Sequence, residues 1–208
     1  VAVDVLFAGG VLPERAQLLA AAYALAPELS WRIVGPDRWR QPVTFASVWE
    51  NRTVPHADYV AAIRSARIVL DIPRDETVSF AGRTNRRGIP ATGVGCRPFE
   101  VTGCGRFLLT DDSRQDIFQL FPNGSVGIYR QGDAADLAAQ VRYYLEHEEE
   151  REKAADEAQL WTLAHHTYGH RVRELTDIVQ AWLDTRLPGK VSSPRRAARP
   201  LGSEGPKK

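Results

Sequence analysis

Apolar runs alternate with amphipathic stretches along most of this chain. Short runs at residues 2–8, 31–34 and 67–72 are each followed by glycine or proline, and such runs are typical of strands covered on both faces of a parallel sheet. Pro13 opens a stretch in which apolar residues return at helical spacing. Strands and helices in alternation predict an α/β fold, a Rossmann-like doubly wound parallel sheet flanked by helices.

The same alternation continues to residue 187. Further helices are predicted at residues 56–66, 113–121, 134–145, 148–164 and 168–187, with a strand at residues 126–129. The stretch from Asp37 to Arg52 has no clear period and is predicted as a loop with room for one short strand. We expect residues 1–187 to form one domain, and residues 188–208, which are rich in Pro, Ser and Arg, to form a disordered basic tail.

The last two predicted helices carry apolar stripes. A thin seam is formed by Ala155, Ala158 and Leu160, and a second stripe by Val172, Leu175, Ile178, Val179 and Leu183. His165-His166-Thr167 interrupts the two helices. Because adjacent histidines face different sides of a helix, they suit a helix junction that contacts a partner domain better than a shared metal ion.

The most informative stretch is Gly95–Asp112. Pro98 suits the first turn of a helix, Gly105 suits the position after its last turn, and a short buried strand follows. The start of this helix leaves backbone N–H groups without helical partners, those of Cys96, Arg97 and Phe99. The positive end of the helix dipole lies at the same place, so these groups predict an anion site that a phosphate would fit.

Glu100 lies in the first turn of the same helix, next to the predicted anion site. A carboxylate there is able to accept two hydrogen bonds from a vicinal diol, such as the ribose of a nucleotide. In the other interpretation, it complements the helix dipole or reaches back to an unpaired N–H group as half of a capping box. The residues alone favour this second interpretation.

Composition excludes several classes of function. The chain has 208 residues and a net charge of +1, which gives no general attraction to nucleic acid or anionic lipid. No apolar run reaches the roughly 18 residues of a membrane-spanning helix, which predicts a soluble protein without a transmembrane segment. Cys96 and Cys104 have neither a CxxC pair nor a histidine at ligand spacing, so neither zinc nor a disulfide framework is expected. The chain has no methionine and opens at Val1 within a strand pattern, so we expect a piece of a longer protein.

Several segments, in this order, carry a resemblance to a known family: Val5-Leu6-Phe7-Ala8-Gly9, Ala66-Arg67-Ile68-Val69-Leu70, the stretch from Arg97 to Asp111, Tyr144-Leu145-Glu146-His147, Arg151-Glu152, and His166-Thr167-Tyr168 with His170-Arg171. Together they resemble the C-terminal, donor-binding domain of GT-B glycosyltransferases, and within them the spore-maturation CgeB-like branch. The resemblance covers residues 3 to about 176, and the ordered combination is more specific than any single segment.

The resemblance implies that this domain binds a nucleoside-diphosphate sugar, without a metal or other cofactor, and transfers the sugar to an acceptor. The acceptor would bind an N-terminal Rossmann-like domain that this chain lacks. Glu100 matches the glutamate that binds the donor ribose, which strengthens the ribose interpretation. The diphosphate is implied at the other matching positions, Gly9, Gly10, Arg15, Gly95, Cys96 and Arg97. No catalytic acid or base is assigned, so activity is not expected without the missing domain, and a cytoplasmic location is expected.

Two positions depart from the family pattern. Thr92 stands where many retaining members carry an earlier glutamate, and a threonine supplies no charge near the sugar, so retaining chemistry is not implied. Asp71 ends a predicted strand where related sequences often have asparagine, a change expected to alter how the following loop is anchored. Arg15, Arg97 and the arginines of the polar loop at residues 73–94 are candidates for stabilising the diphosphate leaving group.

Two other functions remain open for the same fold. One is a non-catalytic binding or structural module of a cell or spore surface, which would require no diphosphate affinity. The other is a nucleotide-sugar epimerase, which would turn over its substrate without an acceptor. Fold analogy supports all three, because one fold hosts many functions.

Overall fold

The computed structural model describes residues 3–37, 42–74, 89 and 91–186. The chain divides into two units, one that ends at Thr167 and one that begins at Tyr168. The predicted tail at residues 188–208 lies outside the described residues, as do Arg83, Arg86 and Arg87 of the polar loop.

Within the described part of the chain, six parallel strands form one sheet in the order β3-β2-β1-β4-β5-β6. The strands are β1 (Val3–Ala8), β2 (Trp31–Val34), β3 (Trp49–Glu50), β4 (Ala66–Asp71), β5 (Phe107–Asp111) and β6 (Gly127–Tyr129). The two-residue β3 is the short strand for which the sequence left room. The predicted doubly wound α/β fold is confirmed.

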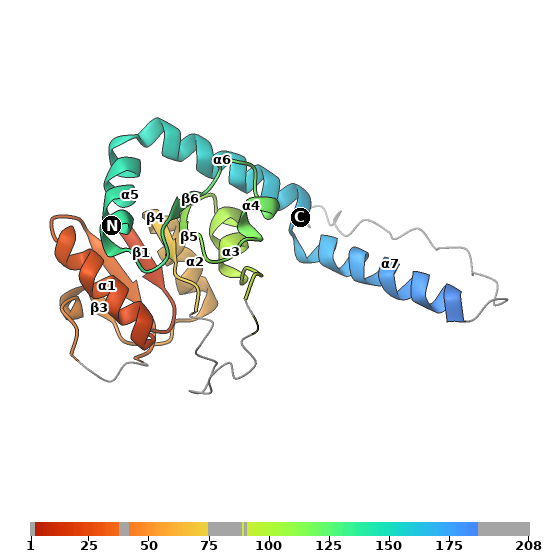
Figure 1. Ribbon diagram of the computed structural model, residues 1–208, viewed down its shortest axis with the longest axis horizontal. Helices are drawn as coiled ribbons and strands as arrows, with labels where there is room; N and C mark the ends of the chain where they lie inside the picture. Colours follow the sequence, from red (N-terminus) through yellow and green to blue (C-terminus); the bar gives the residue numbers. More distant parts are fainter. Residues whose placement is uncertain (1–2, 38–41, 75–88, 90, 187–208) are drawn as a thin grey trace, which may run out of the picture. The chain divides into compact units, whose positions relative to one another are not determined.

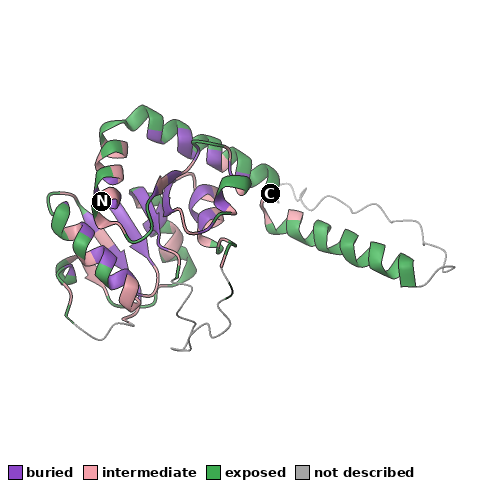
Figure 2. Cartoon of the chain, viewed as in Figure 1, coloured by how far each residue is buried: buried purple, intermediate pink, exposed green. Residues whose placement is uncertain are grey.

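Helices cover both faces of this sheet. They are α1 (Pro13–Leu25), α2 (His56–Ser65), α3 (Arg97–Gly103), α4 (Ile117–Leu120), α5 (Ala134–Glu146) and α6 (Glu148–His165), with a 3₁₀ turn, η1 (Ala46–Val48). Val5 and Phe7 of β1 pack in the same core cluster as residues of α1 and α5, whereas Leu6 and Ala8 pack with α2 and α3 (Figure 1). This alternation follows from the two-residue period of a strand. The central strands β1, β4 and β5 are therefore largely buried on both faces, whereas β3 at the edge is half-buried (Figure 2).

Two details differ from the sequence-based expectation. The helix predicted at residues 113–121 is reduced to the four residues of α4. The reason is that Ser113 donates its backbone N–H to Asp111 Oδ1 at 3.0 Å, which makes a side-chain turn after β5 in place of a helix start. In α6, Ala155 and Ala158 are buried as expected, but Leu160 is 70% exposed and does not belong to the seam.

The break at residues 165–167 is confirmed, because α6 ends at His165 and α7 (Tyr168–Arg186) begins three residues later. None of the residues of α7, which is described along its whole length, is buried (Figure 2). Its predicted apolar stripe is present as exposed side chains. No helix in the described part of the chain is long and apolar enough to cross a membrane.

Candidate functional site

The site lies where the order of strands reverses. The chain leaves β1 toward β2 and β3 and later returns to β4 on the other side of β1. Loops that follow β1 and β4 therefore diverge, and the crevice between them is where open α/β sheets bind ligands. The turn after β1 is held close to β2, because the backbone N–H of Gly9 donates to the carbonyl of Val34 at 2.8 Å.

The guanidinium group of Arg97 bridges this crevice. Its Nη1 lies 3.2 Å from Oδ1 of Asp71, at the end of β4, and its central carbon lies 5.5 Å from the ring centre of Phe7 in β1. A Cβ atom on Gly9 would lie 2.5 Å from Nη2 of Arg97, which is closer than van der Waals contact permits. Arg97 thus fastens the first turn of α3 to the ends of β1 and β4, and a side chain at residue 9 would displace its guanidinium group.

A second cation, which is buried, lies under the same turn. Arg15 of α1 is 7% exposed, and its Nη1 donates to the carbonyl of Gly10 at 3.1 Å. Burial, together with repulsion from Arg97, lowers the pKa of Arg15 to about 10, so it stays charged at neutral pH. Burial raises the pKa of Asp71, and attraction to Arg97 and Arg15 opposes that shift. Asp71 thus interacts with both guanidinium groups, while Glu14 lies near Arg15 and Glu100 near Arg97.

Glu100 lines a pocket of about 280 Å³ beside the β1 turn. Its walls also include Ala8, Gly9, Val34, Gly35, Pro36, Arg52, Thr53, Val54, Tyr59 and Arg97. The Tyr59 hydroxyl of α2 donates to Oε2 of Glu100 at 2.7 Å. The volume is near the lower end of the range for small-molecule sites, roughly 300–1,000 Å³. The carboxylate of Glu100 therefore faces a space with room for a small polar group.

The pocket brings together only part of the predicted set. Gly9, Arg97 and Glu100 line it, whereas Gly10, Arg15, Gly95 and Cys96 do not. Gly95 and Cys96 are exposed, and the carbonyl of Gly10 accepts a hydrogen bond from Arg15. Whether these residues contact a ligand stays a prediction.

Tyr59 and the wall formed by Gly35, Pro36 and residues 52–54 were missed by sequence reasoning. Tyr59 occurs at helical spacing with Val60 and Ile63, and this pattern predicts a side chain that only fills the core. Its contact with Glu100 joins residues 41 positions apart, which a local pattern does not reveal. Of the missed pocket residues, only Gly35-Pro36 was marked in the sequence, as the turn that ends a predicted strand.

The sequence that forms this site matches a known protein family. A model of the family described as "Glycosyl transferase-like" matches residues 15–177. The chain belongs to this family. No curated protein matches the glycosyl transferase-like chain.

Solved structures share the fold of this glycosyl transferase-like domain. Sucrose-phosphate synthase from Thermosynechococcus elongatus is 14% identical, with a TM-score of 0.65 over 88% of this chain and 46% of its own. Anabaena HepE in complex with UDP-glucose is 13% identical, with a TM-score of 0.65 over 86% of this chain and 49% of its own. The catalytic domain of cholesterol-α-glucosyltransferase from Helicobacter pylori is 14% identical, with a TM-score of 0.58 over 79% of this chain and 99% of that one.

These likenesses show the fold, which matches the C-terminal domains of GT-B glycosyltransferases. The glycosyl transferase-like chain spans about half the length of the first two of these proteins.

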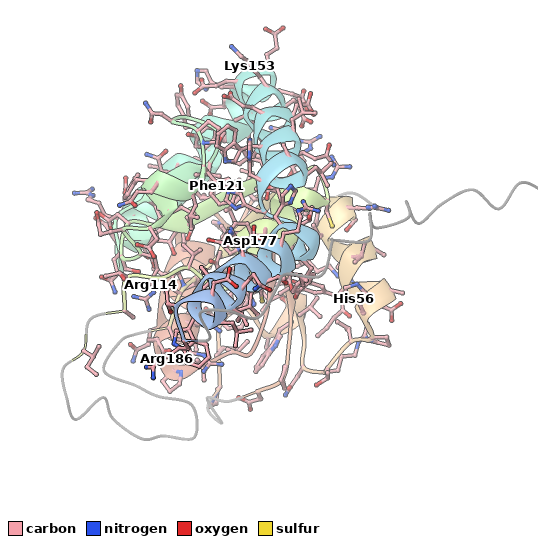
Figure 3. The ribbon with its side chains drawn as sticks, turned by 90° about the vertical axis from the view of Figure 1, so that its right-hand side faces the viewer. His56, Arg114, Phe121, Lys153, Asp177 and Arg186 are labelled. Atoms are coloured by element: carbon pink, nitrogen blue, oxygen red, sulfur yellow. The ribbon has the colours of Figure 1, made fainter. Side chains whose placement is uncertain are left out.

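Helix α3, which carries Arg97 and Glu100, is held from its other side by α6. The hydroxyl of Thr102 lies 2.7 Å from that of Thr162, and both residues are buried. Phe99 stacks on Phe121, labelled in Figure 3, with ring centres 5.5 Å apart. These contacts fix the angle at which α3 presents Glu100 to the pocket.

The Thr102–Thr162 contact yields an asymmetric prediction for stability. Thr102 Oγ1 also lies 2.7 Å from the carbonyl of Pro98, to which it donates its one hydrogen, so Thr162 donates to Thr102. Thr102→Val leaves the buried Thr162 donor without its acceptor and is expected to cost about 1–2 kcal/mol. Thr162→Val leaves the Thr102–Pro98 bond intact and should cost less. Urea unfolding of the two single variants and the double variant checks this order, and equal losses would contradict it.

The described residues contain no cluster of metal-ligating side chains. No group of three or more His, Cys, Asp or Glu side chains in the described ranges is arranged to hold a metal ion. Cys96 and Cys104 are both free, and burial, with a smaller contribution from Glu100, raises the pKa of the Cys96 thiol. That donor binding needs no metal stays a prediction.

Proposed function

We propose that this chain is the donor-binding half of a glycosyltransferase that uses a nucleoside-diphosphate sugar. One observation carries the proposal: the carboxylate of Glu100 lines a pocket beside the glycine turn of β1, at the point where the strand order reverses. A carboxylate in this position suits the two hydroxyl groups of a ribose. The family assignment and the structure of HepE with UDP-glucose support the same class of ligand.

The diphosphate is proposed to lie over the turn at Gly9 and Gly10. Arg15 is buried beneath this turn and Arg97 is half-buried beside it, and each is held by a hydrogen bond, to the Gly10 carbonyl and to Asp71. Sugar transfer develops negative charge on the departing diphosphate, and fixed cations stabilise that charge without any covalent step. Residues of this half thus bind the donor and stabilise its leaving group.

Further parts of the proposal concern the whole protein. We place the acceptor on an N-terminal Rossmann-like half, which also supplies any general base, so the chain alone is inactive in transfer. Membership of the CgeB-like branch and a cytoplasmic location are part of the same proposal.

Calorimetry of the 208-residue chain with UDP, GDP, ADP and TDP in turn tests the proposal. We expect one diphosphate to bind, and Glu100→Gln to weaken it about tenfold or more, because the variant loses charged acceptors for the ribose hydroxyls. Glu149→Gln, an exposed substitution on α6, is the matched control and should bind as the native chain does.

Failure of every diphosphate to bind would favour a non-catalytic module, and equal affinity of native chain and Glu100→Gln would remove Glu100 from the site. Turnover of a sugar nucleotide without acceptor would instead identify an epimerase.

A further inference from the structure

We infer that Tyr59 is a positioning residue of the donor site, which holds one oxygen of the Glu100 carboxylate so that the remaining lone pairs face the ribose hydroxyls. The inference rests on the proposed function and adds a residue that the sequence assigned to the core. It concerns how strongly the site distinguishes ribose from deoxyribose.

The contact itself is well formed. The hydroxyl of Tyr59 in α2 donates to Oε2 of Glu100 in α3 at 2.7 Å, a good length for a hydrogen bond to a carboxylate. Both side chains line the same pocket. A bond that joins two helices at the pocket wall fixes the carboxylate where a ligand would meet it.

A cation, Arg97, lies close to the Tyr59 hydroxyl. Its guanidinium group opposes the rise of the Tyr59 pKa, and Arg97 is paired with Asp71 at 3.2 Å. The phenol donates its single hydrogen to Glu100, because an ionised carboxylate only accepts. The Arg97–Asp71 ion pair at the end of β4 and the Tyr59–Glu100 bond therefore lie next to each other at the pocket.

The donor role holds across the physiological range. Burial, aided by the hydrogen bond to Glu100, raises the pKa of Tyr59 to about 12, so the hydroxyl keeps its proton at neutral pH. An ionised carboxylate has about four acceptor positions, of which Tyr59 uses one and a vicinal diol two. Tyr59 and a ribose can thus bind Glu100 together, and the carboxylate is oriented before the ligand arrives.

Calorimetry with a matched pair of ligands separates this role from a merely structural one. The probes are the ribonucleoside diphosphate that binds best and its 2′-deoxy form. We expect the native chain to prefer the ribose form about tenfold, and Tyr59→Phe to reduce that preference about fivefold while its affinity for the deoxy form changes by less than about twofold. Tyr59→Phe combined with Glu100→Gln should lose no more than Glu100→Gln alone.

Tyr143→Phe is the matched control. It removes another tyrosine–glutamate bond, from Tyr143 to Glu150 at 2.8 Å, on an exposed surface of α5 and α6. This variant should keep the full ribose preference.

Three results overturn the inference alone. Tyr59→Phe keeps the native preference for ribose, or it weakens the binding of both ligands equally, as the loss of a structural residue would. In the third, it binds the ribose form more tightly, because the Tyr59 hydroxyl competes with the ribose for Glu100. Absence of diphosphate binding by the native chain, or a ribose preference that survives Glu100→Gln, overturns the proposed function and this inference with it.

Discussion

Replacing Arg97 with alanine is expected to lower the free energy of unfolding by about 3–5 kcal/mol, a large share of the stability of a domain of this size. The substitution removes the partner of Asp71, which is 7% exposed. A buried carboxylate that loses its ion-paired, hydrogen-bonded partner is costly, and the remaining attraction to Arg15 does not replace that bond. The space beside Gly9 and the contact over the Phe7 ring are lost as well.

Urea unfolding followed by tryptophan fluorescence measures this loss. Arg67→Ala is the control, since it breaks an exposed ion pair with Asp4 at 3.3 Å and should cost less than about 1 kcal/mol. If the pairing with Asp71 is the reason, Asp71→Asn added to Arg97→Ala should restore part of the lost stability, because the asparagine is neutral. A loss no larger than that of Arg67→Ala would show that the buried pair does not stabilise the fold.

The same argument explains what the sequence revealed about Arg97. Its position at the start of a proline-led helix was predictable from Pro98 and Gly105, and α3 begins and ends close to where these residues place it. Its backbone N–H was predicted to face an anion, but the role of its side chain was not predictable. The pairing joins Arg97 to Asp71, 26 positions earlier, and only the folded sheet brings them together. That Asp71 alters the anchoring of the loop after β4 stays a prediction.

The fold was more accessible to sequence reasoning than the pocket for a physical reason. Strands such as β1 and β4 are predictable from nearly continuous apolar runs, because both faces of the sheet are covered by helices. Pocket walls depend on which loops come together in space, and residues 52–54 lie in a stretch without periodicity. Glu100 was noticed as a charged residue in a first helical turn, and the family resemblance then favoured its ribose role, whereas Tyr59 shares the helical spacing of core residues.

Gly35→Ala is the second substitution with a large expected effect, about 2–5 kcal/mol of lost stability. Gly35 follows β2 with φ at +150°, a conformation that residues with a side chain rarely adopt. A Cβ atom there would lie 1.9 Å from the carbonyl oxygen of Gly9. That oxygen belongs to the backbone, so no side-chain rotation relieves the overlap, and the turns after β1 and β2 must move apart.

A glycine in open space separates the two contributions. Gly124 has φ at +83° and nothing within 4 Å of a Cβ placed on it, so Gly124→Ala should cost only the conformational penalty, about 1–2 kcal/mol. Thermal and urea unfolding of the two variants compare them directly. Because Gly9 and Gly35 both line the pocket, Gly35→Ala should also weaken diphosphate binding, whereas Gly124→Ala should not. Equal stability losses would mean that close packing of the two turns does not stabilise the sheet. A Gly35→Ala variant that binds diphosphate as the native chain does would mean that this packing does not shape the pocket.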